Sequence, residues 1–92
     1  MTREREREII ERVLSGDTNA FEHLVTENQK NVYNLALRIT RDEQQAFDIT
    51  QETFLKAFIS LKSFRGDSRF SAWLYRLTSN ICIDYLHREK KQ

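Results

Sequence analysis

The sequence contains no proline, two glycines and one cysteine in 92 residues. Because proline is absent and glycine occurs only at positions 16 and 66, little in the chain would interrupt a helix. The lone Cys82 excludes a disulfide within the chain, and one cysteine with two histidines is a poor ligand set for structural zinc. No apolar run comes near the ~20 residues that a membrane span needs. We therefore expect a cytoplasmic domain with no membrane span, no metal and no cofactor.

The length fits one domain, and 39% apolar with 32% charged residues is typical of a folded, soluble domain rather than a disordered tail. The 15 basic and 14 acidic residues leave a formal net charge of +1. A net charge so close to zero argues against nonspecific binding to duplex DNA over a broad surface, so any contact with nucleic acid should be local.

Apolar residues recur at intervals of three and four through most of the chain, which is the spacing of a helical face. They predict helices over residues 3–14, from an N-cap at Asp17 to about residue 39, from Asp42 to about Lys62, and from about Ser68 to His87. Thr40 and Glu43 have the form of a capping box between the second and third helices. No segment alternates with a period of two, so the prediction is a compact all-α domain of four helices.

Two stripes run along the predicted third helix. The first carries three phenylalanines, Phe47, Phe54 and Phe58, and is predicted to be core. The second lies away from it at positions i, i+3, i+4, i+7 and i+11 and consists of Asp48, Gln51, Glu52, Leu55 and Ile59. It is either a solvated acidic face or, because Leu55 and Ile59 leave an apolar centre exposed, a docking surface for a basic helical partner.

Charge and aromatic residues are unevenly distributed. Residues 1–63 hold nine basic and eleven acidic groups, a net −2, whereas residues 64–92 hold six and three, a net +3. In the second segment cations and aromatic rings are interleaved, as single-stranded nucleic acid requires for its phosphates and its unstacked bases. These residues are Phe64, Arg65, Arg69, Phe70, Trp73, Tyr75, Arg76, Tyr85, His87, Arg88, Lys90 and Lys91.

The predicted last helix also has a polar ridge opposite its core stripe. The core stripe comprises Phe70, Leu74, Leu77, Ile81 and Tyr85, and the ridge comprises Arg76, Asn80, Ile83, Asp84 and His87. Asn80 can read a base edge through two hydrogen bonds. The alternative is that Phe70 and Trp73 both belong to the core and that residues 88–91 form an ordinary basic helix end. We expect Phe70 to be core and leave Trp73 open.

No group of residues suggests an enzyme, and we assign no catalytic residue. Cys82 and His87 lie five positions apart on one predicted helix, roughly 140° apart around its axis, so they do not share a face. Asp48 and Glu52 lie on an exposed face with no cavity that would raise the pKa of either carboxyl group, which makes general acid catalysis a poor interpretation. A phosphate-binding loop and a dinucleotide fingerprint are both absent.

Three segments in order resemble region 2 of bacterial sigma factors of the sigma-70 family, extracytoplasmic function (ECF) group. They are DITQETFLKAF (residues 48–58), FRGDSRFSAWLYR (residues 64–76) and NICIDYL (residues 80–86). The opening of the chain, with Gly16, Asp17, Ala20 and Phe21, is similar to that of the same domain. The resemblance covers residues 1–92 and implies the fold of that domain.

The resemblance implies three roles, one in binding RNA polymerase and two in binding promoter DNA. Asp48, Gln51, Glu52, Leu55 and Ile59 match the segment that docks on the clamp coiled coil of the RNA polymerase β′ subunit. Phe64, Arg65, Asp67, Ser68, Phe70 and Trp73 match the segment that opens the promoter −10 element and captures a flipped base. Arg76, Asn80, Asp84, His87 and Arg88 match the segment that recognises the −10 element, chiefly its non-template strand. Anti-sigma factors commonly cover the same faces.

Family members usually continue into a second helical domain that reads the −35 element. This sequence stops at Gln92, so we expect a region 2 domain without that second domain, and weak binding because the avidity of two linked modules is missing. The alternative function is a helical interaction module that binds a regulatory protein without contacting DNA. An enzyme that depends on a metal or a thiol is a distant third.

Overall fold

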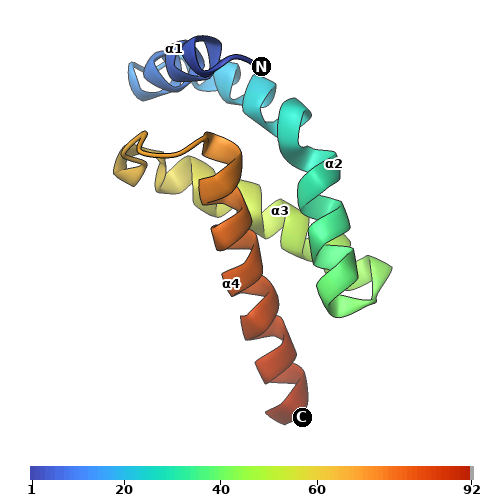
Figure 1. The fold of residues 1–92 in the computed structure, drawn as a ribbon. Helices are drawn as coiled ribbons and strands as arrows, with labels where there is room; N and C mark the ends of the chain where they lie inside the picture. Colours follow the sequence, from blue (N-terminus) through green and yellow to red (C-terminus); the bar gives the residue numbers. More distant parts are fainter. Residues whose placement is uncertain (92) are drawn as a thin grey trace.

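The computed structural model describes the backbone of residues 1–91 and the side chains of residues 1–88, and this part of the chain is all-α, as predicted. The helices are α1 (Arg3–Leu14), α2 (Phe21–Thr40), α3 (Glu43–Ile59) and α4 (Phe70–Lys91), with short 3-10 turns η1 (Thr18–Ala20) and η2 (Leu61–Ser63). Helices α2, α3 and α4 pack together, and α1 lies across one end, above the loop that joins η2 to α4 (Figure 1).

The shape follows from the length of α4. The molecule measures 43 × 23 × 20 Å, and the lower part of α4 extends away from α1 toward the C-terminus (Figure 1). None of the helices that the structure describes combines the length and the hydropathy that crossing a membrane requires. The elongated bundle therefore presents long helical faces on which side chains can be arranged in rows.

The start of α2 differs from the prediction. Asp17 does not cap α2, because its carboxylate accepts two hydrogen bonds from Arg12, at 3.2 and 2.8 Å, and the chain then passes through η1 before α2 begins at Phe21. Gly16 turns the chain with a φ of 113°, a conformation that glycine adopts at little cost. The pairing of Asp17 with Arg12 thus ties this turn to the end of α1.

The predicted capping box between α2 and α3 is wrong. Thr40 is the last residue of α2, and its hydroxyl donates to the Ala36 carbonyl at 2.8 Å. Arg41 then adopts a left-handed conformation with a φ of 57°, and Asp42 caps α3 by accepting a hydrogen bond from the Gln45 backbone N–H at 3.0 Å. The left-handed Arg41 therefore ends α2, and the Asp42 side chain caps the start of α3.

The core consists of two clusters. The one nearer α1 gathers apolar side chains from all four helices and includes the fully buried Phe70, as expected. The second lies between α2, α3 and α4 and includes Ala36, Ile49, Ile81 and Cys82. Leu77 and Tyr85, predicted to be core, are half-buried against these clusters. Helix α4 begins at Phe70, two residues later than predicted, and continues past His87.

The buried face of α3 is not the phenylalanine stripe that the sequence suggests. Phe54 is buried, but Phe47 is 54% exposed and Phe58 is also exposed. The buried line instead runs at strict helical spacing through Ala46, Ile49, Thr50, Thr53, Phe54 and Ala57. Small residues and threonines on this line let α3 lie close to its neighbours, which displaces the two bulky rings to the edge.

Candidate protein and nucleic-acid interfaces

All five members of the predicted docking stripe lie on the outward side of α3, and together they form what is called here the α3 surface: Asp48, Gln51, Glu52, Leu55 and Ile59. Glu52 is half-buried and the other four are exposed. Leu55 is 60% exposed and Ile59 66% exposed, so the surface has an apolar centre in contact with water. Asp48 accepts from Gln44 at 3.1 Å, and Glu52 lies 3.9 Å from the Lys56 ammonium, so neither carboxylate is held in a strong buried pair.

The ring of Phe47 is a further exposed apolar side chain of α3, and the sequence analysis missed it. A groove between α2 and α3 lies beside the α3 surface and shares Gln51 with it. The groove is lined by Gln29, Lys30, Tyr33, Phe47, Thr50 and Gln51. The signal that could have found Phe47 is the line of small and β-branched residues at strict helical spacing, which leaves no room for this ring on the buried face.

The loop after η2 and the start of α4 surround a hollow of about 160 Å³, called here the loop hollow. Six of the residues predicted to bind DNA line it: Phe64, Arg65, Asp67, Ser68, Trp73 and Arg76. Gly66, also in its wall, has a φ of 79°, which gives the loop its tight turn. Residues separated by up to twelve positions in the sequence thus meet at one concave site.

Two aromatic rings, those of Phe64 and Trp73, form one wall of this site, and the ring of Phe70 lies behind them. Trp73 is half-buried, with its ring centroid 5.2 Å from that of Phe64 and 5.7 Å from that of Phe70. Phe64 and Phe70 meet edge to face at 5.8 Å. Trp73 therefore has both of the positions considered for it, because its ring packs on the core and also lines the hollow.

Phe70 has to be removed from the residues predicted to contact DNA. Its side chain is fully buried, so no base can reach it. Its role is to support the two rings that do line the hollow, through the edge-to-face contact with Phe64 and the tilted contact with Trp73. The buried position confirms the helical spacing, which predicts Phe70 as core, whereas only the resemblance placed it among the DNA contacts.

The cations of the loop hollow are available to a ligand. Arg65 and Asp67 form an ion pair with 3.7 Å between Nε and Oδ2, but both side chains are about four-fifths exposed, so this pair contributes little. Arg76 is exposed on the first turns of α4. The hollow therefore combines aromatic rings with two exposed arginines that could pair with a ligand.

The ridge predicted on α4 exists as an exposed row, called here the α4 ridge: Arg76, Asn80, Ile83, Asp84 and His87. Arg88, next to this row, lies over the ring of Tyr85 at 5.3 Å from its centroid, a cation–π contact. Arg76 belongs both to the ridge and to the hollow, so the two are continuous. The side chains of Lys90 and Lys91, which the sequence groups with these cations, lie outside the part of the chain whose side chains are described.

Tyr85 marks the border between α4 and the α3 surface. Partial burial raises the pKa of its phenol, the negative charges of Glu52 and Asp48 raise it further, and the nearby Arg88 opposes them. These influences show that the acidic residues of the α3 surface lie near the C-terminal half of α4. The acidic surface and the α4 ridge are therefore neighbours, on different faces of the same pair of helices.

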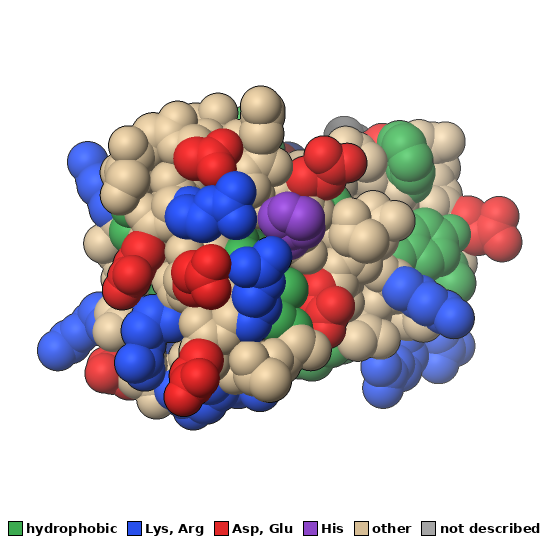
Figure 2. All heavy atoms as spheres, turned by 90° about the horizontal axis from the view of Figure 1, so that it is seen from above, with side chains coloured by type: hydrophobic (Ala, Val, Ile, Leu, Met, Phe, Trp, Pro, Cys, Tyr) green, Lys and Arg blue, Asp and Glu red, His purple; other side chains and the backbone are tan. Residues whose placement is uncertain are grey.

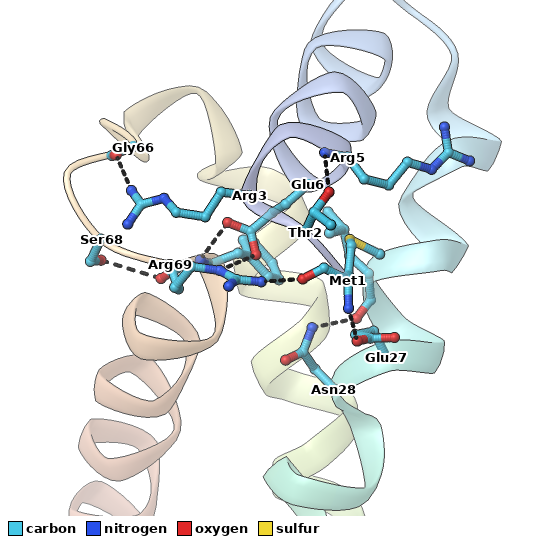
Figure 3. Close-up of polar contacts among 12 residues, drawn as sticks. Met1, Thr2, Arg3, Arg5, Glu6, Glu27, Asn28, Gly66, Ser68 and Arg69 are labelled. Carbon is cyan, nitrogen blue, oxygen red and sulfur yellow. Dashed lines mark hydrogen bonds and ion pairs between the residues drawn. The ribbon is translucent and has the colours of Figure 1, made fainter.

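Sequence reasoning also missed the contacts that hold the loop from the side of α1 (Figure 3). The Glu6 carboxylate accepts from the Phe70 backbone N–H at 3.0 Å and from Arg69 Nε at 3.3 Å. Arg3 donates to the Gly66 carbonyl at 3.3 Å, and Arg69 Nη2 donates to the Met1 carbonyl at 2.6 Å. No local signal could have found these contacts, because they join residues 63 to 68 positions apart.

Residues 24–92 match the family model described as sigma-70 region 2. Among curated proteins, the chain is 42% identical over 86 residues to the RNA polymerase sigma-H factor of Pseudomonas aeruginosa, covering 94% of this chain and 45% of that protein. It is 36% identical over 81 residues to the ECF RNA polymerase sigma factor SigW of Bacillus subtilis, covering 88% and 43%. It is 44% identical over 78 residues to the ECF RNA polymerase sigma-E factor of Escherichia coli, covering 85% and 40%.

The chain thus spans less than half the length of these curated relatives. Among solved structures, it resembles an engineered region 2 of sigmaE in complex with GTAAAA. That structure has a TM-score of 0.85 and 36% sequence identity, with 94% of this chain and 90% of that chain covered. The helical order, the three sequence segments and these comparisons agree, and the chain belongs to the sigma-70 region 2 family, within the extracytoplasmic function group.

Proposed function

We propose that this domain docks on RNA polymerase through the α3 surface and holds one strand of an opened promoter −10 element along the loop hollow and the α4 ridge. The docking partner is the clamp coiled coil of the β′ subunit, and the strand is chiefly the non-template strand. The observation that carries the proposal is the loop hollow, where two aromatic rings and two arginines converge and continue into the α4 ridge through Arg76. A related fold is described in complex with GTAAAA, which supports a nucleic-acid ligand.

The energetics favour an unpaired strand over a duplex. Unstacking a base costs a few kcal/mol, and stacking on an aromatic side chain returns about 1–3 kcal/mol per base. Phe64 and Trp73 offer such surfaces, while Arg65 and Arg76 can pair with phosphates. The polar ridge adds Asn80, which can recognise a base edge. Because the net charge of the domain is close to zero, it should bind a strand tightly only where these groups act together. This favours a local site over a broad basic face.

The α3 surface suits a protein partner. Leu55 and Ile59 expose apolar area that association would bury, and Asp48 and Glu52 flank them with negative charge suited to a basic helix. An anti-sigma factor is a second partner proposed for the same surface, because it would need the same apolar anchors. Binding of such a regulator without any DNA contact remains the competing function.

The test is fluorescence anisotropy with a labelled single strand containing GTAAAA, with and without a fragment of the β′ clamp coiled coil. We expect selective binding over the complementary strand, strengthened by the clamp fragment. If Arg65 and Arg76 each contact a phosphate, the slope of log affinity against log salt should be roughly −1.4. Arg76→Ala and Asn80→Ala should weaken strand binding and leave clamp binding unchanged. If neither the strand nor the clamp fragment binds, the proposal is wrong, and if only protein partners bind, the competing function is favoured.

A further inference from the structure

The N-terminal helix α1 approaches the start of α4 and the loop before it through a small set of polar contacts. Figure 3 shows Glu6 and Arg3 of α1 directed at the loop residues Gly66 and Arg69. Between these contacts a second hollow, of about 240 Å³, separates α1 from the loop and is lined by residues such as Arg7, Ile10 and Phe64. Because packing is not continuous here, the position of the loop depends strongly on the few hydrogen bonds across the gap.

Glu6 makes the central contact. It is only 8% exposed, and a buried carboxylate is unfavourable unless it is paired. One of its oxygens accepts from the Phe70 N–H at 3.0 Å, and the other accepts from Arg69 Nε at 3.3 Å. Phe70 is the first residue of α4, so Glu6 acts as the N-cap of α4 from 64 positions away in the sequence.

The residue before α4 cannot perform this capping itself. Arg69 has only hydrogen-bond donors in its side chain, whereas a cap must accept. A negative carboxylate at the N-terminus of a helix is also stabilised by the helix dipole. Glu6 therefore fixes the point at which the loop ends and α4 begins, which is the point that sets Phe64 and Trp73 relative to each other.

Glu6 is unsuited to contacting the strand itself. It is buried, and its charge would repel phosphate. The face of the molecule that carries α1 shows basic and acidic side chains intermixed rather than a patch of one sign (Figure 2). We infer that Glu6 is a positioning residue, which holds the loop hollow in its strand-binding shape by capping α4 and anchoring Arg69. This inference rests on the proposed function of the hollow.

The test compares Glu6→Ala and Glu6→Gln with the control Glu4→Ala, which changes an exposed carboxylate on the same helix. Loss of an N-cap should change the equilibrium constant between the ordered and the disordered loop by about tenfold. We expect Glu6→Ala to weaken binding of the GTAAAA strand by about tenfold, Glu6→Gln to weaken it less, and Glu4→Ala to leave it unchanged. Binding of the clamp fragment, which uses the α3 surface, should stay within twofold in all three.

Amide hydrogen exchange provides a readout that does not require a ligand. Residues 64–73 should exchange faster in Glu6→Ala, while Glu6→Gln, which keeps an acceptor for the Phe70 N–H, should retain protection at Phe70. A merely structural role would lower strand binding and clamp binding by the same factor, and that result would overturn the inference. So would unchanged exchange and unchanged strand affinity in Glu6→Ala.

The two proposals can fail separately. If Glu6→Ala does not fold, Glu6→Gln decides by the same two measurements. If the unaltered chain binds no strand, the proposed function is wrong, and the exchange pattern of residues 64–73 still decides whether Glu6 positions the loop.

Discussion

Replacement of Leu55 by alanine tests the α3 surface with least disturbance to the fold. Leu55 is 60% exposed, so the core loses little when its side chain is shortened. Alanine has a higher helix propensity than leucine, so α3 should form as well as before. The unfolding midpoint of Leu55→Ala should therefore stay close to that of the unaltered chain, and any loss of binding can be assigned to the surface.

The expected magnitude follows from the exposed fraction. Complete burial of a leucine side chain stabilises by about 1.5–3 kcal/mol, and 60% of this side chain remains for a partner to cover. Leu55→Ala should thus lose about 1–2 kcal/mol of binding free energy to the β′ clamp fragment. That is roughly a 5- to 30-fold increase in Kd, measurable by isothermal titration calorimetry.

A matched control is available on the same chain. Leu14, at the end of α1, is 51% exposed and lies outside the α3 surface, so Leu14→Ala removes a similar exposed side chain elsewhere. Its Kd for the clamp fragment should not change. If Leu55→Ala binds within twofold of the unaltered chain, or if both variants weaken equally, then the α3 surface does not bind the clamp fragment.

Three further predictions concern stability and can be measured by chemical denaturation. Thr53 is fully buried with no hydrogen-bond partner for its hydroxyl among the described atoms, whereas the equally buried Thr78 donates to the Leu74 carbonyl at 2.7 Å. Thr53→Val should stabilise by about 1 kcal/mol and Thr78→Val should not, and equal effects would contradict the structure. Arg41→Gly should stabilise by about 1 kcal/mol because it relieves a left-handed arginine with a φ of 57°, and a lower midpoint would refute this. Burial raises the pKa of the Cys82 thiol above its ordinary value of 9.0, so its contribution is present below about pH 9 and is lost as pH rises through the folded-state pKa. The unaltered chain should therefore lose more stability than Cys82→Ala between pH 8 and pH 10.5, and equal losses would refute the assignment.

The helices could be predicted from the sequence because their apolar residues follow the helical period. The predicted buried face of α3 was wrong because some polar residues of this helix are buried and some apolar residues are exposed. Thr50 and Thr53 are polar by composition but face the core, since Thr50 satisfies its hydroxyl on the Ala46 carbonyl at 2.8 Å. Phe47 is apolar but lies at the edge. If burial is assigned from residue type alone, the buried face of α3 is therefore predicted on the wrong side of the helix.

The rows of the candidate site on α3 and α4 could be predicted from the sequence, but the geometry of the loop hollow could not. The rows on α3 and α4 depend only on helical spacing, so the sequence gives their membership directly. The loop hollow depends on contacts across the chain, such as that between Glu6 and Phe70, and residue spacing carries no information about these. The interleaved cations and rings of the sequence already indicated Phe64, Arg65, Trp73 and Arg76, and the resemblance to sigma-70 region 2 added Asp67 and Ser68. The resemblance also placed Phe70 among the DNA contacts, although helical spacing predicts it as core.

The position of Phe70 explains why the hollow can persist in a loop. Phe70 begins α4 inside the core, where it also meets Phe21 edge to face at 6.4 Å, so the rings of Phe64 and Trp73 rest on a residue fixed by α2. Its backbone N–H is held at the same time by Glu6 of α1. The start of α4 is thus fixed on both sides, by core packing and by a cap. Binding of a flexible single strand costs less ordering entropy when the walls of the site are already fixed. This is the physical reason to expect the aromatic wall to rest against the first turn of α4, through Phe70, rather than to lie at the tip of the loop.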